Sequence, residues 1–149
     1  MNQNLKFPRR ALLAGAAAAV STNFLGLASA DEPLTLIVHP GTTDTPSLAE
    51  VAAVFTTRKQ NWSDGSRIVP FNFPPKHAVR VSFDQAVLQM GPDDVARYWI
   101  DRRIRGGNPP PKQVPTAALI ARLVEKLEGS IAYVPQSFVS PQVRVVRHI

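Results

Sequence analysis

Hydrophobic and polar residues recur at two different spacings along residues 31–149, and each spacing predicts one kind of element. Short runs rich in β-branched residues predict strands at 34–38, 67–73, 130–134 and 142–149. Apolar residues three or four positions apart predict helices after residue 47 and in 77–90, 91–105 and 116–129. Strands that alternate with helices favour an α/β sandwich, in which helices flank a mixed sheet.

Capping residues mark the ends of these helices. Ser47 stands three residues before Glu50, which is the spacing of a capping box. Asp93 and Thr116 are each placed to cap the helix that follows, and Gly129 is expected to end the last helix. The expected buried face of that last helix consists of Leu119, Ile120, Leu123, Val124 and Leu127.

Prolines and tryptophans refine this picture. Pro70 lies inside the second predicted strand and argues for an edge position or a bulge, because proline cannot donate to a ladder. Residues 106–115 include three consecutive prolines and are expected to form an extended loop. Trp62 and Trp99 could stack on a base or a sugar, but large aromatic residues belong in a core more often than in a binding face.

Residues 1–30 have the three parts of a secretory signal. Lys6, Arg9 and Arg10 precede an apolar run, and Ala28, Ser29 and Ala30 form a small-residue cleavage site. The run is shorter than the ~20 residues that a membrane span needs, so we expect cleavage after Ala30 and a periplasmic protein that does not span the membrane. The paired arginines resemble a twin-arginine signal, and the general secretory route stays open.

Charge and cysteine content narrow the class of the mature chain, residues 31–149. Loss of the signal leaves 14 of the 17 basic residues against 11 acidic ones, a net charge of +3, which is weak support for nucleic-acid binding. The sequence has no cysteine, so disulfides and thiolate chemistry are excluded.

Motifs for catalysis or metal binding are missing from the sequence. There is no G-x-S-x-G or S-x-x-K pattern, and His39, His77 and His148 stand on separate elements. Asp93 and Asp94 are better explained by the start of a helix than by an acid/base pair. The arginines of residues 97–105 are interrupted by an acid and indicate a solvated helix face. We therefore expect a protein that is not an enzyme and carries no metal or cofactor.

Two segments could hold an anion at the start of a helix, where backbone N–H groups point outward. These segments are residues 39–47 and 76–83, and the second adds Arg80, a bidentate partner for an oxyanion, and Ser82. Ordinary helix capping is the alternative explanation for each segment.

A series of short motifs resembles the small periplasmic proteins that serve as phosphate-binding components of ABC transporters. In chain order they are Val54-Phe55, Trp62-Ser63-Asp64-Gly65, Ile68-Val69-Pro70, Arg80 with Phe83, Trp99, residues 106–111 and residues 129–134. The resemblance spans nearly all of residues 34–147. It implies a single lobe of the type II periplasmic-binding-protein fold, since the chain has about half the length of a two-lobed relative.

The resemblance also implies a function and a site. It points to weak binding of phosphate or a similar oxyanion by Arg80 and Ser82, with Lys76 and His77 nearby; the Ser-Gly-Thr loop of the larger relatives is replaced here. An ABC transporter permease would be the partner. The alternative is a lobe that has lost ligand binding and acts as an interaction or structural component of an envelope complex. A single lobe leaves an apolar interface uncovered, so a homodimer is expected in either case.

Overall fold

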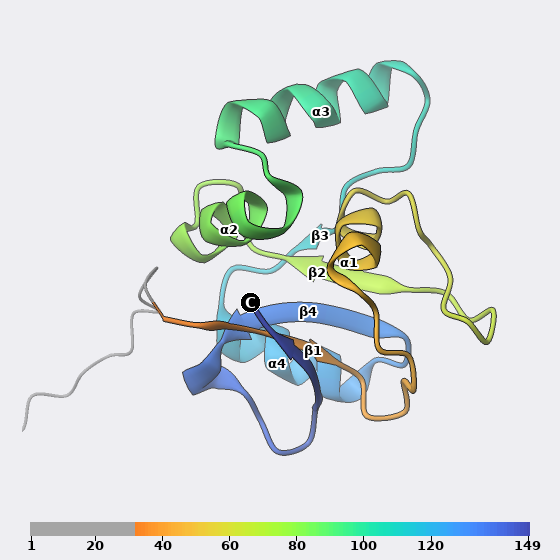
Figure 1. Ribbon diagram of the computed structural model, residues 1–149, viewed down its shortest axis with the longest axis vertical. Coiled ribbons are helices and arrows are strands. Elements are labelled where there is room, and N and C mark those ends of the chain that lie inside the picture. Colours follow the sequence, from red (N-terminus) through yellow and green to blue (C-terminus); the bar gives the residue numbers. More distant parts are fainter. Residues whose placement is uncertain (1–31) are drawn as a thin grey trace, which may run out of the picture.

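The computed structural model describes residues 32–149, which form a mixed sheet with helices on both sides (Figure 1). The strands are β1 (Leu34–Val38), β2 (Val69–Asn72), β3 (Lys112–Gln113), β4 (Ser130–Pro135) and β5 (Arg144–His148). The helices are α1 (Leu48–Phe55), α2 (Ala78–Phe83), α3 (Pro92–Ile104) and α4 (Ala117–Lys126), with a π-helical turn η1 (Asp84–Leu88) and a 3₁₀ turn η2 (Gln136–Phe138). The predicted signal, residues 1–30, lies outside the described residues.

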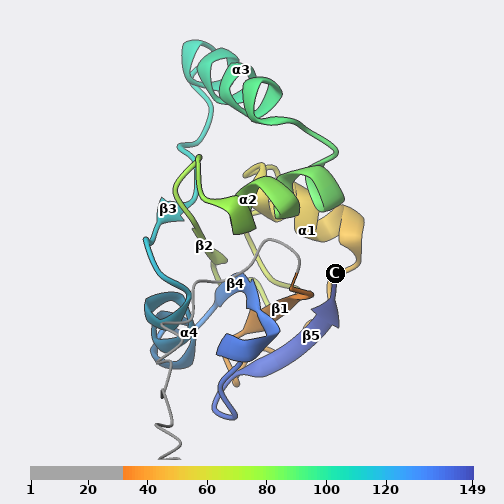
Figure 2. The same cartoon turned by 90° about the vertical axis from the view of Figure 1, so that its left-hand side faces the viewer.

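The strand order is β3-β2-β4-β1-β5. Strand β2 runs parallel to β3 and β4, whereas β1 runs antiparallel to β4 and β5. Helices α1 and α2 lie on the side of the sheet opposite α4, and α3 lies beyond α1 and α2 (Figures 1 and 2). The predicted α/β sandwich with a mixed sheet is confirmed.

The burial of β1 and β4 explains why the sequences of these two strands are so apolar. Every residue of β1 and β4 is buried, as expected for strands with helices or chain on both faces. Tyr133 of β4 stacks on Phe83 with ring centroids 3.7 Å apart, and its hydroxyl donates to the side-chain oxygen of Asn72. This aromatic contact fixes α2 above the middle of the sheet.

Two of the predicted capping residues are confirmed and two are wrong. Helix α4 ends at Lys126 with Leu127, rather than Gly129, as its C-cap. The Ser47 hydroxyl accepts from the N–H of Glu50, whose carboxylate accepts from the N–H of Ser47 in return. Thr116 caps α4. Asp93 does not cap α3, because Gly91 is the N-cap and Pro92 the first helical residue. Proline has the φ angle of a helix and lacks only an N–H that the first turn leaves unused, so it starts the helix two residues earlier than predicted.

Two predictions about the sheet are corrected. A two-residue strand, β3, lies inside residues 106–115, which were expected to be a loop, and it makes β2 an interior strand rather than an edge strand. The N–H of Val69 donates to Gly129 beside β4, so the nitrogen of Pro70 faces the other side. Strand β3 pairs only with Phe71 and Asn72, so Pro70 lies at the one place where no donor is required.

The outer helices bury less than their sequences suggest. Leu119 of α4 is 44% exposed and Leu127, its C-cap, 42% exposed. The buried face of α4 is the narrower stripe of Ala117, Ile120, Ala121 and Val124. Trp62 is buried as expected, but Trp99 of α3 is half-buried and Ile104 is 80% exposed. Helix α3 therefore contributes only one of its faces to the packing. No helix within residues 32–149 is long and apolar enough to cross a bilayer.

Candidate functional site

Lys76 and His77 lie where the chain enters α2. Lys76 is exposed, and His77 is the N-cap of α2, with its Nδ1 accepting from the N–H of Val79 at 3.3 Å. The His77 ring stacks on Phe73 with centroids 4.4 Å apart. Partial burial lowers the pKa of His77, so the imidazole is neutral at neutral pH and Lys76 supplies the positive charge at this position.

Arg80 points into the protein instead of toward solvent. It is 4% exposed, its Nε lies 3.2 Å from Oδ2 of Asp84, and its Nη1 donates to the carbonyl of Phe73 at 3.0 Å. These contacts hold α2 against the end of β2. Ser82 lies half-buried further along the helix. The role of Lys76, His77, Arg80 and Ser82 as ligand-binding residues stays a prediction.

The two segments that were predicted to hold an anion lie at opposite edges of the sheet. Residues 39–47 follow β1, and residues 76–83 begin shortly after the end of β2. Strand β2 runs in the direction opposite to β1, because β1 is antiparallel and β2 parallel to β4. One ligand therefore cannot contact both segments. Many polar groups of residues 39–47 already have partners: Arg144 donates to the carbonyls of Thr42 and Asp44 at 3.1 and 2.7 Å.

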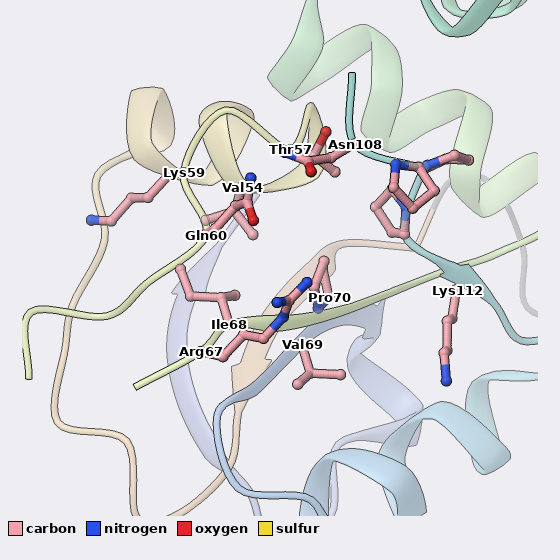
Figure 3. Close-up of a pocket in the computed structure, with 13 residues that line it drawn as sticks. Val54, Thr57, Lys59, Gln60, Arg67, Ile68, Val69, Pro70, Asn108 and Lys112 are labelled. Carbon is pink, nitrogen blue, oxygen red and sulfur yellow. The ribbon is translucent and has the colours of Figure 1, made fainter. Parts of the chain in front are cut away.

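A hollow of about 210 Å³ lies between the end of α1, the start of β2 and the proline-rich segment (Figure 3). Its lining consists of Val54, Thr57, Lys59, Gln60, residues 67–70 and residues 108–112. The apolar part of the lining comes from Val54, Ile68, Val69 and the prolines. Three of the lining residues are cationic, namely Lys59, Arg67 and Lys112, and none is acidic.

The positions of the cations follow from the fold. Arg67 precedes β2, and its carbonyl oxygen would lie 2.4 Å from a Cβ on residue 129, so only a glycine fits at Gly129. Lys112 is the first residue of β3. Figure 3 shows the Arg67 guanidinium beside Pro70.

The charge of the hollow is only partly neutralised by its neighbours. Lys59 forms an ion pair with Glu50, its Nζ lying 2.6 Å from Oε1. Arg67 and Lys112 form no ion pair within residues 32–149. Two cations next to an apolar surface attract an anion, since its charge is screened less there than in open water.

One wall of the hollow has a strained backbone. Thr57 has a positive φ of 58°, which is unfavourable for a β-branched residue. Arg102 of α3 stabilises this conformation, because its Nε donates to the Thr57 hydroxyl at 3.2 Å and its Nη2 to the Thr57 carbonyl at 3.0 Å. Helix α3 therefore sets the shape of the hollow from outside.

The groups that line the hollow could attract an anion. Within residues 32–149 no three His, Asp or Glu side chains come together in a way that could hold a metal ion. The sequence analysis missed the hollow because Arg67 was predicted to begin a strand and Lys112 to lie in a loop, with nothing to link the two segments. The available signal was Lys112 directly after the three prolines and Arg67 two residues after Gly65.

No protein-family model and no curated sequence matches the chain, but several solved structures have a similar fold. An ABC-type phosphate transport receptor from Vibrio cholerae superposes with a TM-score of 0.62 at 12% identity, over 78% of this chain and 46% of the receptor. The chain shares the fold of the matched part of this receptor. This confirms the predicted resemblance to phosphate ABC transporter substrate-binding proteins and the periplasmic-binding-protein-like lobe.

Two further phosphate-receptor structures agree. A phosphate ABC transporter substrate-binding protein with bound phosphate from Clostridium perfringens gives a TM-score of 0.62 at 18% identity, with 78% of this chain and 44% of that chain covered. PstS from Borrelia burgdorferi gives 0.61 at 14% identity, with 77% and 46% covered. The chain spans less than half the length of each of these proteins. At such identities the likeness establishes the fold alone.

Proposed function

We propose that this chain is an exported, non-enzymatic binding protein of the periplasmic-binding-protein-like class, and that it takes a phosphate-like oxyanion. The phosphate-receptor fold supports the class of protein. The observation that carries the proposed ligand is the hollow of Figure 3, with its three cations and no acidic lining residue.

Arg67 and Lys112 are the proposed direct ligands. A guanidinium matches two oxygens of a phosphate or a carboxylate, and the lysine ammonium adds a point charge. The hollow is open to solvent on one side, and salt screens charges that water reaches. We therefore expect weak binding that declines as ionic strength rises.

The start of α2 is the second proposed location. There Lys76 supplies the charge, His77 and Ser82 supply polar groups, and Arg80 positions the helix through its contacts to Asp84 and Phe73. The buried carboxylate of Asp84 balances the charge of Arg80, so this location has less net positive charge than the hollow.

Thermal unfolding distinguishes the two locations, since a ligand that binds only the folded protein raises its melting temperature. We would measure the purified chain with phosphate, with sulfate, and with chloride at matched ionic strength. The Arg67→Ala/Lys112→Ala double variant tests the hollow, Lys76→Ala tests the start of α2, and Arg122→Ala is the control, because Arg122 is an exposed cation on α4.

We expect phosphate to raise the melting temperature more than sulfate does. This effect should be lost only in the double variant. Loss only in Lys76→Ala would transfer the site to the start of α2. If no anion raises the melting temperature, the proposed ligand is overturned and an interaction module in the envelope is favoured.

Periplasmic localisation and an ABC transporter permease as partner belong to the same proposal. Replacing Arg9 and Arg10 by lysine is expected to block export if the signal is of the twin-arginine kind. Unchanged export of this variant would assign the chain to the general secretory route, and retention of the unaltered chain in the cytoplasm would contradict the proposal.

A further inference from the structure

Helix α3 contacts the rest of the protein through one face only. On that face Val95 is buried, Tyr98 donates its hydroxyl to the carbonyl of Thr56 at 2.9 Å, and Arg102 binds Thr57. Figures 1 and 2 show α3 as the outermost element, beyond α1 and α2. Its opposite face is therefore directed away from the sheet.

This outer face carries an apolar stripe. With 3.6 residues per turn, Asp93, Ala96, Ile100 and Ile104 lie opposite the inward-facing residues. Ile100 is 61% and Ile104 80% exposed, the largest exposed fractions among the large hydrophobic residues described. A hollow of about 430 Å³ adjoins the stripe, and Trp99, Arg103 and the residues after the helix line it. Exposed apolar surface of this kind marks a contact site.

The charges on α3 divide into those with partners and those without. Two ion pairs on the helix flanks join Asp94 to Arg97 at 3.0 Å and Asp101 to Arg105 at 2.9 Å. Asp93 and Arg103 form no ion pair within residues 32–149. They stand ten residues apart, about 15 Å along the helix, at either end of the stretch that contains Ala96 and Ile100. An acid and a base without partners thus lie on either side of an exposed apolar surface.

We propose that the outer face of α3 binds the same face of a second copy of the chain, with the two helices antiparallel. A two-fold axis near residue 98 brings Asp93 opposite Arg103 of the second copy, twice by symmetry. The same arrangement places Ile100 opposite Ala96 of the second copy. A large residue facing a small one lets two helices approach to the usual 8–10 Å.

Charge complementarity favours the antiparallel arrangement over the parallel one. In a parallel pair Asp93 would face Asp93, and Arg103 would face Arg103, so each contact would be repulsive. The antiparallel pair makes two attractive contacts and closes on itself as a dimer. A single pair of helices buries less surface than a standard stable interface, so we expect a dimer that dissociates on dilution.

Sedimentation velocity of the purified chain, from micromolar to hundreds of micromolar concentration, tests this proposal. The unaltered chain is expected to shift from monomer to dimer. Ile100→Glu should remain monomeric, while Arg122→Asp, an exposed change on α4, should leave the dimer intact. Thermal unfolding of each variant verifies that its fold is retained. The measurement contains no phosphate, so its outcome is independent of the proposed ligand.

Charge reversal tests the register of the two helices. Asp93→Arg alone and Arg103→Asp alone each create two like-charge contacts, and we expect each to weaken dimerisation at least tenfold. The double variant exchanges the two charges and should recover most of the affinity. A chain that stays monomeric over the whole range would overturn the proposal, as would a dimer that persists in Ile100→Glu. A double variant that does not recover would reject the antiparallel register.

Discussion

The buried pair of Arg80 and Asp84 allows a sharp test of how α2 is held in place. Both residues are 4% exposed, and their side chains meet at 3.2 Å. Oδ1 of Asp84 is buried without a hydrogen-bond partner in the described part of the chain. Replacing either residue by an apolar one leaves the other buried without its counter-charge, which is far more destabilising than losing an exposed ion pair.

The two single replacements are expected to differ. Asp84→Leu should lower the free energy of unfolding by about 3–5 kcal/mol, because it leaves the guanidinium of Arg80 buried without its counter-charge. Arg80→Met should cost less at mildly acidic pH, because Asp84 can bind a proton. Burial already raises the pKa of Asp84 above its ordinary value of 3.8, and Arg80 is what opposes this rise.

The pH dependence of Arg80→Met follows from the same shift. A carboxyl group with a raised pKa in the folded protein holds a proton that the unfolded chain has released. The folded state of this variant therefore loses stability as pH rises from 3.8 through the raised pKa. We expect Arg80→Met to unfold at lower urea concentration at neutral pH than at mildly acidic pH.

The double variant Arg80→Met/Asp84→Leu removes both charges together. Its free energy of unfolding should equal that of the unaltered chain or exceed it by up to about 1–4 kcal/mol. The reason is that replacing a buried ion pair by apolar groups of similar volume is often neutral or stabilising. Urea unfolding followed by circular dichroism and tryptophan fluorescence gives the four free energies of the cycle. A double variant less stable than either single variant would refute this reasoning, because it would show that the pair itself stabilises the fold.

Three further predictions concern other parts of the molecule. Gly129→Ala should lower the free energy of unfolding by about 2–5 kcal/mol, because both the left-handed φ of 75° and a Cβ placed 2.4 Å from a backbone oxygen oppose a side chain. The control Gly65→Ala has a φ of 85° but open space around the added Cβ, and should lower the free energy of unfolding by only about 1–2 kcal/mol in the same urea titration. Equal losses in the two variants would contradict the close approach at Gly129. Tyr133→Phe should lower stability by about 1–3 kcal/mol by leaving a buried amide oxygen without its donor, and an unchanged melting temperature would be evidence against that hydrogen bond. Hydrogen bonds from Lys59 and from residue 47 lower the pKa of Glu50 from 4.5 to about 2, so acid titration should weaken the unaltered chain progressively across that interval, and Glu50→Gln should abolish this part of the pH dependence.

The candidate site was only partly predictable from the sequence. The residues at the start of α2 could be proposed from the sequence because a helix start with a nearby arginine is a local pattern, and their role stays a prediction. The direction of Arg80 depends on where Asp84 and the Phe73 carbonyl lie, and side-chain direction cannot be read from spacing alone. The hollow brings together Arg67 and Lys112, which are 45 positions apart in the sequence, and no local pattern links them.

The sequence by itself determined the central strands, the helices and two of the helix caps, as well as the class of fold. Such features depend on neighbours within a few residues, as the Ser47–Glu50 capping box does, or on how apolar a segment is. Only the tertiary structure decided that β2 is an interior strand, that the outer face of α3 is exposed, and that the two anion-binding segments lie at opposite edges. Those outcomes depend on strand order and direction, which are set by contacts between distant residues.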